Sequence, residues 1–171
     1  ACAPPQVPVS AASRTADWKT TGGEPGNTHY SYLDQINRLN VSQLQVAWTY
    51  HTGDADTARH TQIQATPIVI DGVLYSTTPA LNVVALRADA GTLIWRFDPF
   101  AGRQRATHVN RGVAYWSDGN QRRVFFTAGR RLYSLDATNG QPDHAFGDSG
   151  SIDLSDGLGR DVSDTDVLAT S

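Results

Sequence analysis

Two polar side chains stand just before apolar runs, where they could bind the oxygen atoms of a ligand. Arg111 precedes the run GVAYW, and Gln64 occupies the equivalent point before an earlier run that begins at Ile68. A guanidinium offers five donors in a fixed plane, and a neutral amide both donates and accepts hydrogen bonds. Position alone leaves an alternative open, in which both are solvated side chains at the starts of strands.

Metal chemistry finds little support in the residue pattern. The aspartates at 161, 164 and 166 form a cluster that lacks the glycine and the closing glutamate of a calcium loop, so we interpret it as a polar loop. Four histidines show no spacing typical of a metal site: His29, His51, His60 and His144. No metal ligand is therefore assigned in this chain.

The elements that must position Gln64 and Arg111 are short strands. Between Gln64 and Trp95, apolar runs at 68–70, 73–75, 83–86 and 93–95 alternate with turn residues. Asp71-Gly72 between two such runs is a strong hairpin signal, because both central turn positions need a positive φ. This stretch is predicted to be a four-stranded antiparallel meander.

A second meander follows at a fixed interval. Leu86, Ala88 and Gly91 recur 49 positions later as Leu135, Ala137 and Gly140, a spacing typical of propeller blades. Its strands are expected at 112–116, 124–128 and 131–135, with a weak fourth at 145–146, and a further strand is expected to start at 167–171. The predicted fold class is an all-β β-propeller, of which two to three blades are present.

The segments before the first meander are expected to join the same core. The run 44–51 is predicted to be the outer strand of an earlier blade, and Trp48, like Trp95, is expected to pack against a neighbouring blade. Residues 33–44 are expected to hold one or two helical turns, with Asn40 as a cap and Leu39 and Leu44 buried. The loop 17–32 is expected to be pinned to the core by its aromatic residues, Trp18, Tyr30 and Tyr32.

Composition limits the classes of function. Charged residues make up 18% of the 171 residues and the net charge is -3, so there is no basic patch of the kind that nucleic acid requires. No apolar run is long enough to span a membrane. Two meanders and parts of two others cannot close a ring, so we expect a segment of a longer protein or one chain of a cleaved pair.

Residues 1–16 are expected to be a flexible tether, and residues 17–171 to form the partial propeller. Cys2 is the only cysteine and precedes a linker rich in proline, alanine and serine. This pattern resembles a bacterial lipoprotein cleavage site, and the alternative is an unpaired thiol in a tail. Ala1 counts against the lipid interpretation, because a mature lipoprotein would begin at its cysteine.

Several motifs in succession resemble the N-terminal region of the pyrroloquinoline quinone (PQQ)-dependent dehydrogenases, the quinoprotein glucose, polyol and alcohol dehydrogenases. They include Asp17-Trp18, LQVAW at 44–48, Thr66-Pro67 with DGVLY at 71–75, and NRGVAYW at 110–116. The residues Ala85-Leu86, Asp89, Gly91 and Trp95 resemble that family's tryptophan-docking motif, with departures at Arg87 and Ala90. The resemblance implies an eight-bladed propeller whose first blades are in this chain.

The resemblance also implies a reaction and a location. It implies oxidation of a sugar, polyol or other alcohol hydroxyl in the bacterial periplasm, with PQQ and Ca²⁺ as cofactors and with electrons passed to ubiquinone or a cytochrome. Gln64, Arg111 and Thr170 are implied to contact the cofactor. His108 is implied either to contact the cofactor or substrate or to be a loop histidine, and Asn110 either to donate to the cofactor or to cap a turn. The calcium ligands and the catalytic base are expected beyond Ser171.

One departure bears on the substrate. The alcohol-oxidising branch of the family carries two adjacent cysteines just before the Asn-Arg-Gly run, where this chain has Ala106-Thr107-His108. This resembles the sugar- and polyol-oxidising branches. A non-catalytic propeller that serves as a protein-binding scaffold in the bacterial envelope is the alternative function, but a scaffold has no reason to keep Arg111 and Gln64 together.

Overall fold

The structure is a computed structural model that describes residues 17–58, 60–101, 109–159 and 169. The expected tether at 1–16, with Cys2, lies outside these ranges, and of the strand expected at 167–171 only Ala169 is described. None of the helices in these ranges is long and apolar enough to cross a membrane.

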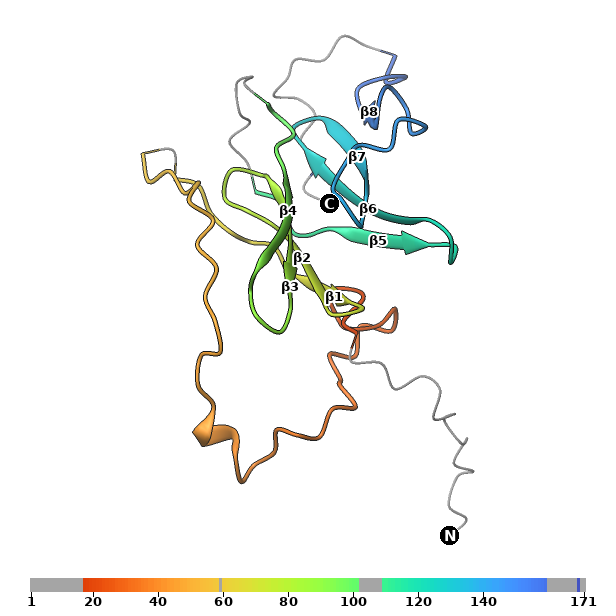
Figure 1. Ribbon diagram of the computed structural model, residues 1–171. Coiled ribbons are helices and arrows are strands. Elements are labelled where there is room, and N and C mark those ends of the chain that lie inside the picture. The colour runs from red at the N-terminus through yellow and green to blue at the C-terminus, as the bar shows by residue number, and fades with distance from the viewer. Residues whose placement is uncertain (1–16, 59, 102–108, 160–168, 170–171) are drawn as a thin grey trace.

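Two four-stranded antiparallel sheets make up the ordered core, as predicted (Figure 1). The first sheet has the order β1-β2-β3-β4 and contains β1 (Ile68–Ile70), β2 (Val73–Thr77), β3 (Val83–Arg87) and β4 (Leu93–Phe97). The second sheet has the order β5-β6-β7-β8 and contains β5 (Ala114–Ser117), β6 (Arg122–Ala128), β7 (Arg131–Asp136) and β8 (Ser151–Asp153).

The hairpin at Asp71-Gly72 confirms the turn prediction. Both residues have a positive φ, 51° and 74°, and Ile70 pairs directly with Val73 across the turn. A two-residue turn of this kind matches the right-handed twist of the strands that it joins. The turn therefore fixes the register of β1 against β2.

The prediction of the fourth strand in the second sheet was wrong. The strand that pairs with β7 is β8, five residues after the expected position at 145–146. The expected segment instead forms a turn, in which the Phe146 amide donates to the Asp143 carbonyl at 2.8 Å and the Gly150 amide donates to the Phe146 carbonyl at 2.9 Å. A turn of this kind cannot continue a ladder, so pairing with β7 resumes only at Ser151.

One apolar core spans both sheets. Val83 and Ala85 of β3 are fully buried with Val124 of β6 and Leu135 of β7. Because β3 is buried on both faces, four of its five side chains are buried, and its sequence is a continuous apolar run rather than an alternating one. The two sheets thus pack against each other as neighbouring blades.

Trp95 is the main contact between the sheets. Its indole N–H donates to the Ala137 carbonyl at 2.9 Å, and its ring lies over Gly140, where a Cβ would come within 2.5 Å of the ring. Trp48 makes the same pair of contacts one repeat earlier, with the Ala88 carbonyl at 3.0 Å and with Gly91. The expected packing of both tryptophans against a neighbouring blade is confirmed.

The predicted strand at 44–51 does not form. No described segment hydrogen-bonds to its backbone as a ladder partner, and a strand exists only where a second strand satisfies its N–H and C=O groups. Figure 1 shows the orange part of the chain looping away from both sheets. The side chain of Trp48 is what attaches this segment to the first sheet.

The predictions for residues 30–44 were also largely wrong. The only helix in the described residues is η2 (Val41–Gln43), and Asn40 does not cap it with its side chain. That amide serves the preceding turn, where its Oδ1 accepts from the Asn37 amide at 2.8 Å. Leu39 is 87% exposed, and Leu44, Tyr30 and Tyr32 are exposed as well. Trp18 is attached to the first sheet through its backbone, which pairs with Val69, while its ring lies beside Gly23 of its own loop.

The contact of Trp95 with Gly140 predicts that a methyl group added at Gly140 destabilises the protein more than one added at an open glycine. Gly140→Ala should lower the free energy of unfolding of the full-length protein by about 2–4 kcal/mol, from a strained positive φ and from overlap with the Trp95 ring. Gly53→Ala is the matched control, because Gly53 has nearly the same φ (70° against 72°) but open space around its Cβ. We expect the control to lose only about 1 kcal/mol by chemical denaturation. Equal losses would show that the ring does not approach Gly140.

Tyr75 predicts a loss of stability at high pH. Burial raises the pKa of its hydroxyl to about 12 from the ordinary 10.0, and the hydroxyl donates to the Ala137 carbonyl at 3.2 Å. Between these two values the unfolded chain releases the proton while the folded protein keeps it, so stability falls as pH rises through that window. Tyr75→Phe should show a shallower fall between pH 10 and 12 in denaturation experiments, and an unchanged slope would contradict this assignment.

Candidate functional site

The starts of the two innermost strands lie side by side. Thr66, two residues before β1, forms a parallel bridge with Gly112, two residues before β5. The Thr66 amide donates to the Arg111 carbonyl at 2.9 Å. This pairing brings Gln64 and Arg111 to the same end of neighbouring blades.

The register corrects one detail of the prediction. Because Thr66 faces Gly112, the residue opposite Arg111 is Ala65. Gln64 therefore lies one position earlier than the point equivalent to Arg111. In a strand-like segment, successive side chains point to opposite sides, so Gln64 points to the side opposite to that of Ala65 and Arg111.

Both side chains are exposed. The Gln64 amide donates to the Gln62 side chain at 3.1 Å, and no carboxylate in the described residues pairs with Arg111. An exposed guanidinium without an intramolecular partner keeps its donors available for a ligand. Carboxylate and quinone oxygens are acceptors that such a guanidinium can bind.

Gly112 lets the two strand starts approach closely. Its φ of 153° lies in a region that side chains rarely adopt, and a Cβ there would come within 3.0 Å of the Thr66 carbonyl oxygen. The glycine that follows Arg111 is therefore needed for the contact between the blades at this point.

Asn110 is buried behind Arg111, with 2% of its surface exposed. Its Oδ1 accepts from the Gly112 amide at 2.7 Å and from the Thr77 hydroxyl at 3.2 Å, and its Nδ2 donates to the Thr127 carbonyl at 2.9 Å. The whole amide is thus engaged within the protein. This arrangement favours the cap over direct donation to the cofactor.

Two of the predicted site residues cannot be placed. His108, with Ala106 and Thr107, and Thr170 lie outside the described residues. Ala169, which precedes Thr170, accepts a hydrogen bond from the Thr127 hydroxyl at 2.8 Å. Their contacts with a cofactor stay predictions.

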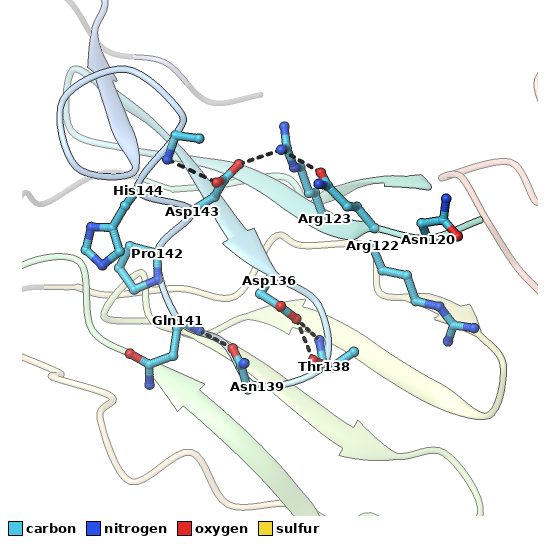
Figure 2. A pocket seen from close by; sticks show the side chains of 12 residues that line it. Asn120, Arg122, Arg123, Asp136, Thr138, Asn139, Gln141, Pro142, Asp143 and His144 are labelled. Atoms are coloured by element: carbon cyan, nitrogen blue, oxygen red, sulfur yellow. Dashed lines mark hydrogen bonds and ion pairs between the residues drawn. The ribbon is translucent and has the colours of Figure 1, made fainter. Parts of the chain in front are cut away.

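A cleft in the described part of the chain lies elsewhere. It has a volume of about 530 Å³ and is lined from the β5–β6 turn, β6 and the loop after β7 (Figure 2). Because β5 runs from Arg111 toward this turn, the cleft lies at the far end of the strand from the candidate site. Sequence reasoning did not anticipate it, because its residues carry no motif.

Both arginines of this cleft pair with aspartates. Arg123 pairs with Asp143 at 3.0 Å, as Figure 2 shows, and Arg122 pairs with Asp71 of the first sheet at 3.3 Å. At its edge, the amides of Gln121 and Asn120 hold the pKa of the Asp118 carboxyl below its usual value. Nowhere in the described ranges do three potential metal ligands come together. The cleft therefore supplies no catalytic constellation.

Comparisons with known proteins agree with this geometry. Residues 18–171 match the family described as PQQ glucose/ethanol/alcohol dehydrogenase, β-propeller domain. The chain is 38% identical over 141 residues to the quinohemoprotein alcohol dehydrogenase ADH-IIG of Pseudomonas putida, which covers 75% of this chain and 19% of that protein. It is 32% identical over 184 residues to the quinate/shikimate dehydrogenase (quinone) of Acinetobacter baylyi, covering 92% of this chain and 22% of that protein.

A solved structure shows the same arrangement of blades. The quinohemoprotein alcohol dehydrogenase from Comamonas testosteroni superposes with a TM-score of 0.64 at 34% identity, over 85% of this chain and 20% of that one. The chain spans about a fifth of the length of the curated relatives that it matches. The two sheets are therefore part of a β-propeller, and the chain belongs to the family of PQQ-dependent glucose, ethanol and alcohol dehydrogenase propellers.

Proposed function

We propose that the protein containing this chain is a PQQ-dependent dehydrogenase that oxidises an alcohol hydroxyl, and that residues 17–171 supply one wall of its active site. The observation that carries this proposal is the exposed guanidinium of Arg111, at the point where Thr66 and Gly112 bring the starts of two neighbouring strands together. A scaffold propeller would need the contacts between blades but not this exposed guanidinium. The similar proteins are named as dehydrogenases, which also favours the enzyme over the scaffold.

PQQ, when bound, supplies the acceptor for the hydride from the carbinol carbon. The guanidinium of Arg111 donates to oxygens of the cofactor and stabilises negative charge that develops on them, because a fixed cation costs no reorganisation during the reaction. The amide of Gln64 donates to or accepts from the edge of the cofactor and so sets its orientation. Removal of the hydroxyl proton falls to a carboxylate in the rest of the protein.

The finer features of the reaction are proposals that rest on sequence. Sugars and polyols are the proposed substrates, because the adjacent cysteines of the alcohol-oxidising branch are missing at 106–108. Ca²⁺ is the proposed Lewis acid, with its ligands in later blades, and ubiquinone or a cytochrome is the proposed electron acceptor. A periplasmic location and a lipid anchor at Cys2 also stay proposals.

The remainder of the propeller is the proposed partner of residues 44–51. Trp48 binds the first sheet as Trp95 of β4 binds the second, so this segment occupies the place of an outer strand of a preceding blade. Its backbone lacks a ladder partner among the described residues, and Val46 is 82% exposed. Pairing with a strand elsewhere in the protein would satisfy the backbone and cover this apolar surface.

Removal of the Arg111 side chain tests the proposed function. Arg111→Ala in the full-length protein should weaken PQQ binding by about 30-fold, the loss of roughly 2 kcal/mol from charge-assisted hydrogen bonds, and should remove most of the dye-linked dehydrogenase activity. Arg122→Ala is the matched control, because Arg122 is equally exposed but lies at the opposite end of the same hairpin. Full retention of PQQ affinity in Arg111→Ala would remove Arg111 from the site.

Hydrogen exchange tests the proposed partner of residues 44–51. In the full-length protein, the amides of this segment should exchange about as slowly as those of β4, because ladder hydrogen bonds protect them. Residues 54–58 provide an internal control, since they form a loop next to the same segment. Exchange at the rate of this loop would show that 44–51 stays unpaired.

A further inference from the structure

A hydrogen bond recurs behind the inner strands, once for each blade. The hydroxyl of Thr77 donates to the Oδ1 of Asn110 at 3.2 Å, and the hydroxyl of Thr127 donates to the Ala169 carbonyl at 2.8 Å. The two threonines occupy equivalent places in their sheets. Thr77 pairs with Val83, and Thr127 pairs with Leu132, which is the counterpart of Val83 in the 49-residue repeat. The second strand of each sheet, β2 or β6, is thus hydrogen-bonded to the chain segment that leads into the following blade.

The side chain of Asn110 joins three segments of the chain at this point. It bonds Thr77 of β2, Thr127 of β6 and the Gly112 amide of its own segment. A second contact from its Nδ2 reaches the Thr127 hydroxyl at 3.3 Å. Because all of its donors and acceptors are occupied in a buried site, the side chain has a single favourable arrangement.

The consequence falls on Arg111. The hydrogen bonds of the Asn110 side chain hold the backbone just before Arg111, and the bridge between Gly112 and Thr66 holds the backbone just after Arg111. Its carbonyl is itself bonded to the Thr66 amide. Its side chain is exposed to solvent. A long side chain loses less freedom on binding when its Cα–Cβ bond already points toward the ligand.

We propose that Asn110 is a positioning residue, which links two blades and thereby aims the Arg111 guanidinium at the cofactor without touching it. Thr77 and Thr127 share this role through their bonds to Asn110. The inference rests on the proposed function, because it assigns the cofactor contact to Arg111.

A double-mutant cycle in the full-length protein tests this role, with PQQ affinity measured by titration of the metal-loaded apoprotein. Asn110→Ala should weaken PQQ binding about tenfold when Arg111 is present, and by less than about twofold in an Arg111→Ala background, because it acts through that arginine. Thr77→Val, which removes one hydrogen bond at similar shape, should show the same dependence with a loss of about threefold. If Asn110→Ala does not fold, Thr77→Val combined with Arg111→Ala provides the double-mutant cycle instead.

Asn82→Ala separates positioning from general destabilisation. Asn82 is as buried as Asn110, with 0% of its surface exposed, and its side-chain amide donates to Asp54 at 2.7 Å. We expect it to lower the unfolding midpoint but to leave PQQ affinity within about twofold.

Three outcomes would overturn the proposal. Equal losses of affinity with and without Arg111 would mean that Asn110 contacts the cofactor itself, and unchanged affinity in Asn110→Ala or Thr77→Val would mean that it positions nothing. A loss in Asn82→Ala equal to that in Asn110→Ala would assign the effect to stability. Absence of PQQ binding by the unaltered protein would instead overturn the proposed function, and the positioning role with it.

Discussion

The contact of Trp95 with the turn after β7 is the interaction on which the rest of the structure depends. The indole N–H satisfies the Ala137 carbonyl and the ring covers Gly140, so the spacing between the two sheets is set at one place. Tyr75 adds a second donor to the same carbonyl. Since a four-stranded sheet cannot bury both faces alone, each blade is stable only when such a contact seats it against the next.

The position of the candidate site follows from this packing. When the two sheets are packed together, Thr66 pairs with Gly112, and Gln64 and Arg111 lie exposed at the same end of the two blades. The polar bonds of Asn110 lie behind them, in a place where unsatisfied amide groups would be costly. The same junction therefore stabilises the fold and orients the groups proposed to bind the cofactor.

Local sequence patterns predicted the first sheet well, because its turns depend on particular residues. Asp71-Gly72 adopts the positive φ values that it was expected to adopt, and Trp95 packs against the neighbouring blade as predicted. Prediction failed where pairing depends on distant partners. The fourth strand of the second sheet is Ser151–Asp153 rather than 145–146. Residues 44–51 have no ladder partner among the described residues.

The sequence by itself determined the blade repeat, the family and the identity of Arg111 as the leading candidate, because these rest on residue types at fixed spacing. Only the tertiary structure decided how the two inner strands are aligned, with Ala65 rather than Gln64 opposite Arg111. It also decided that the side-chain amide of Asn110 forms hydrogen bonds with Thr77, Thr127 and Gly112. The bonds of Asn110 to Thr77 and Thr127 and the pairing of Thr66 with Gly112 join segments distant in the sequence, whose register no local pattern encodes.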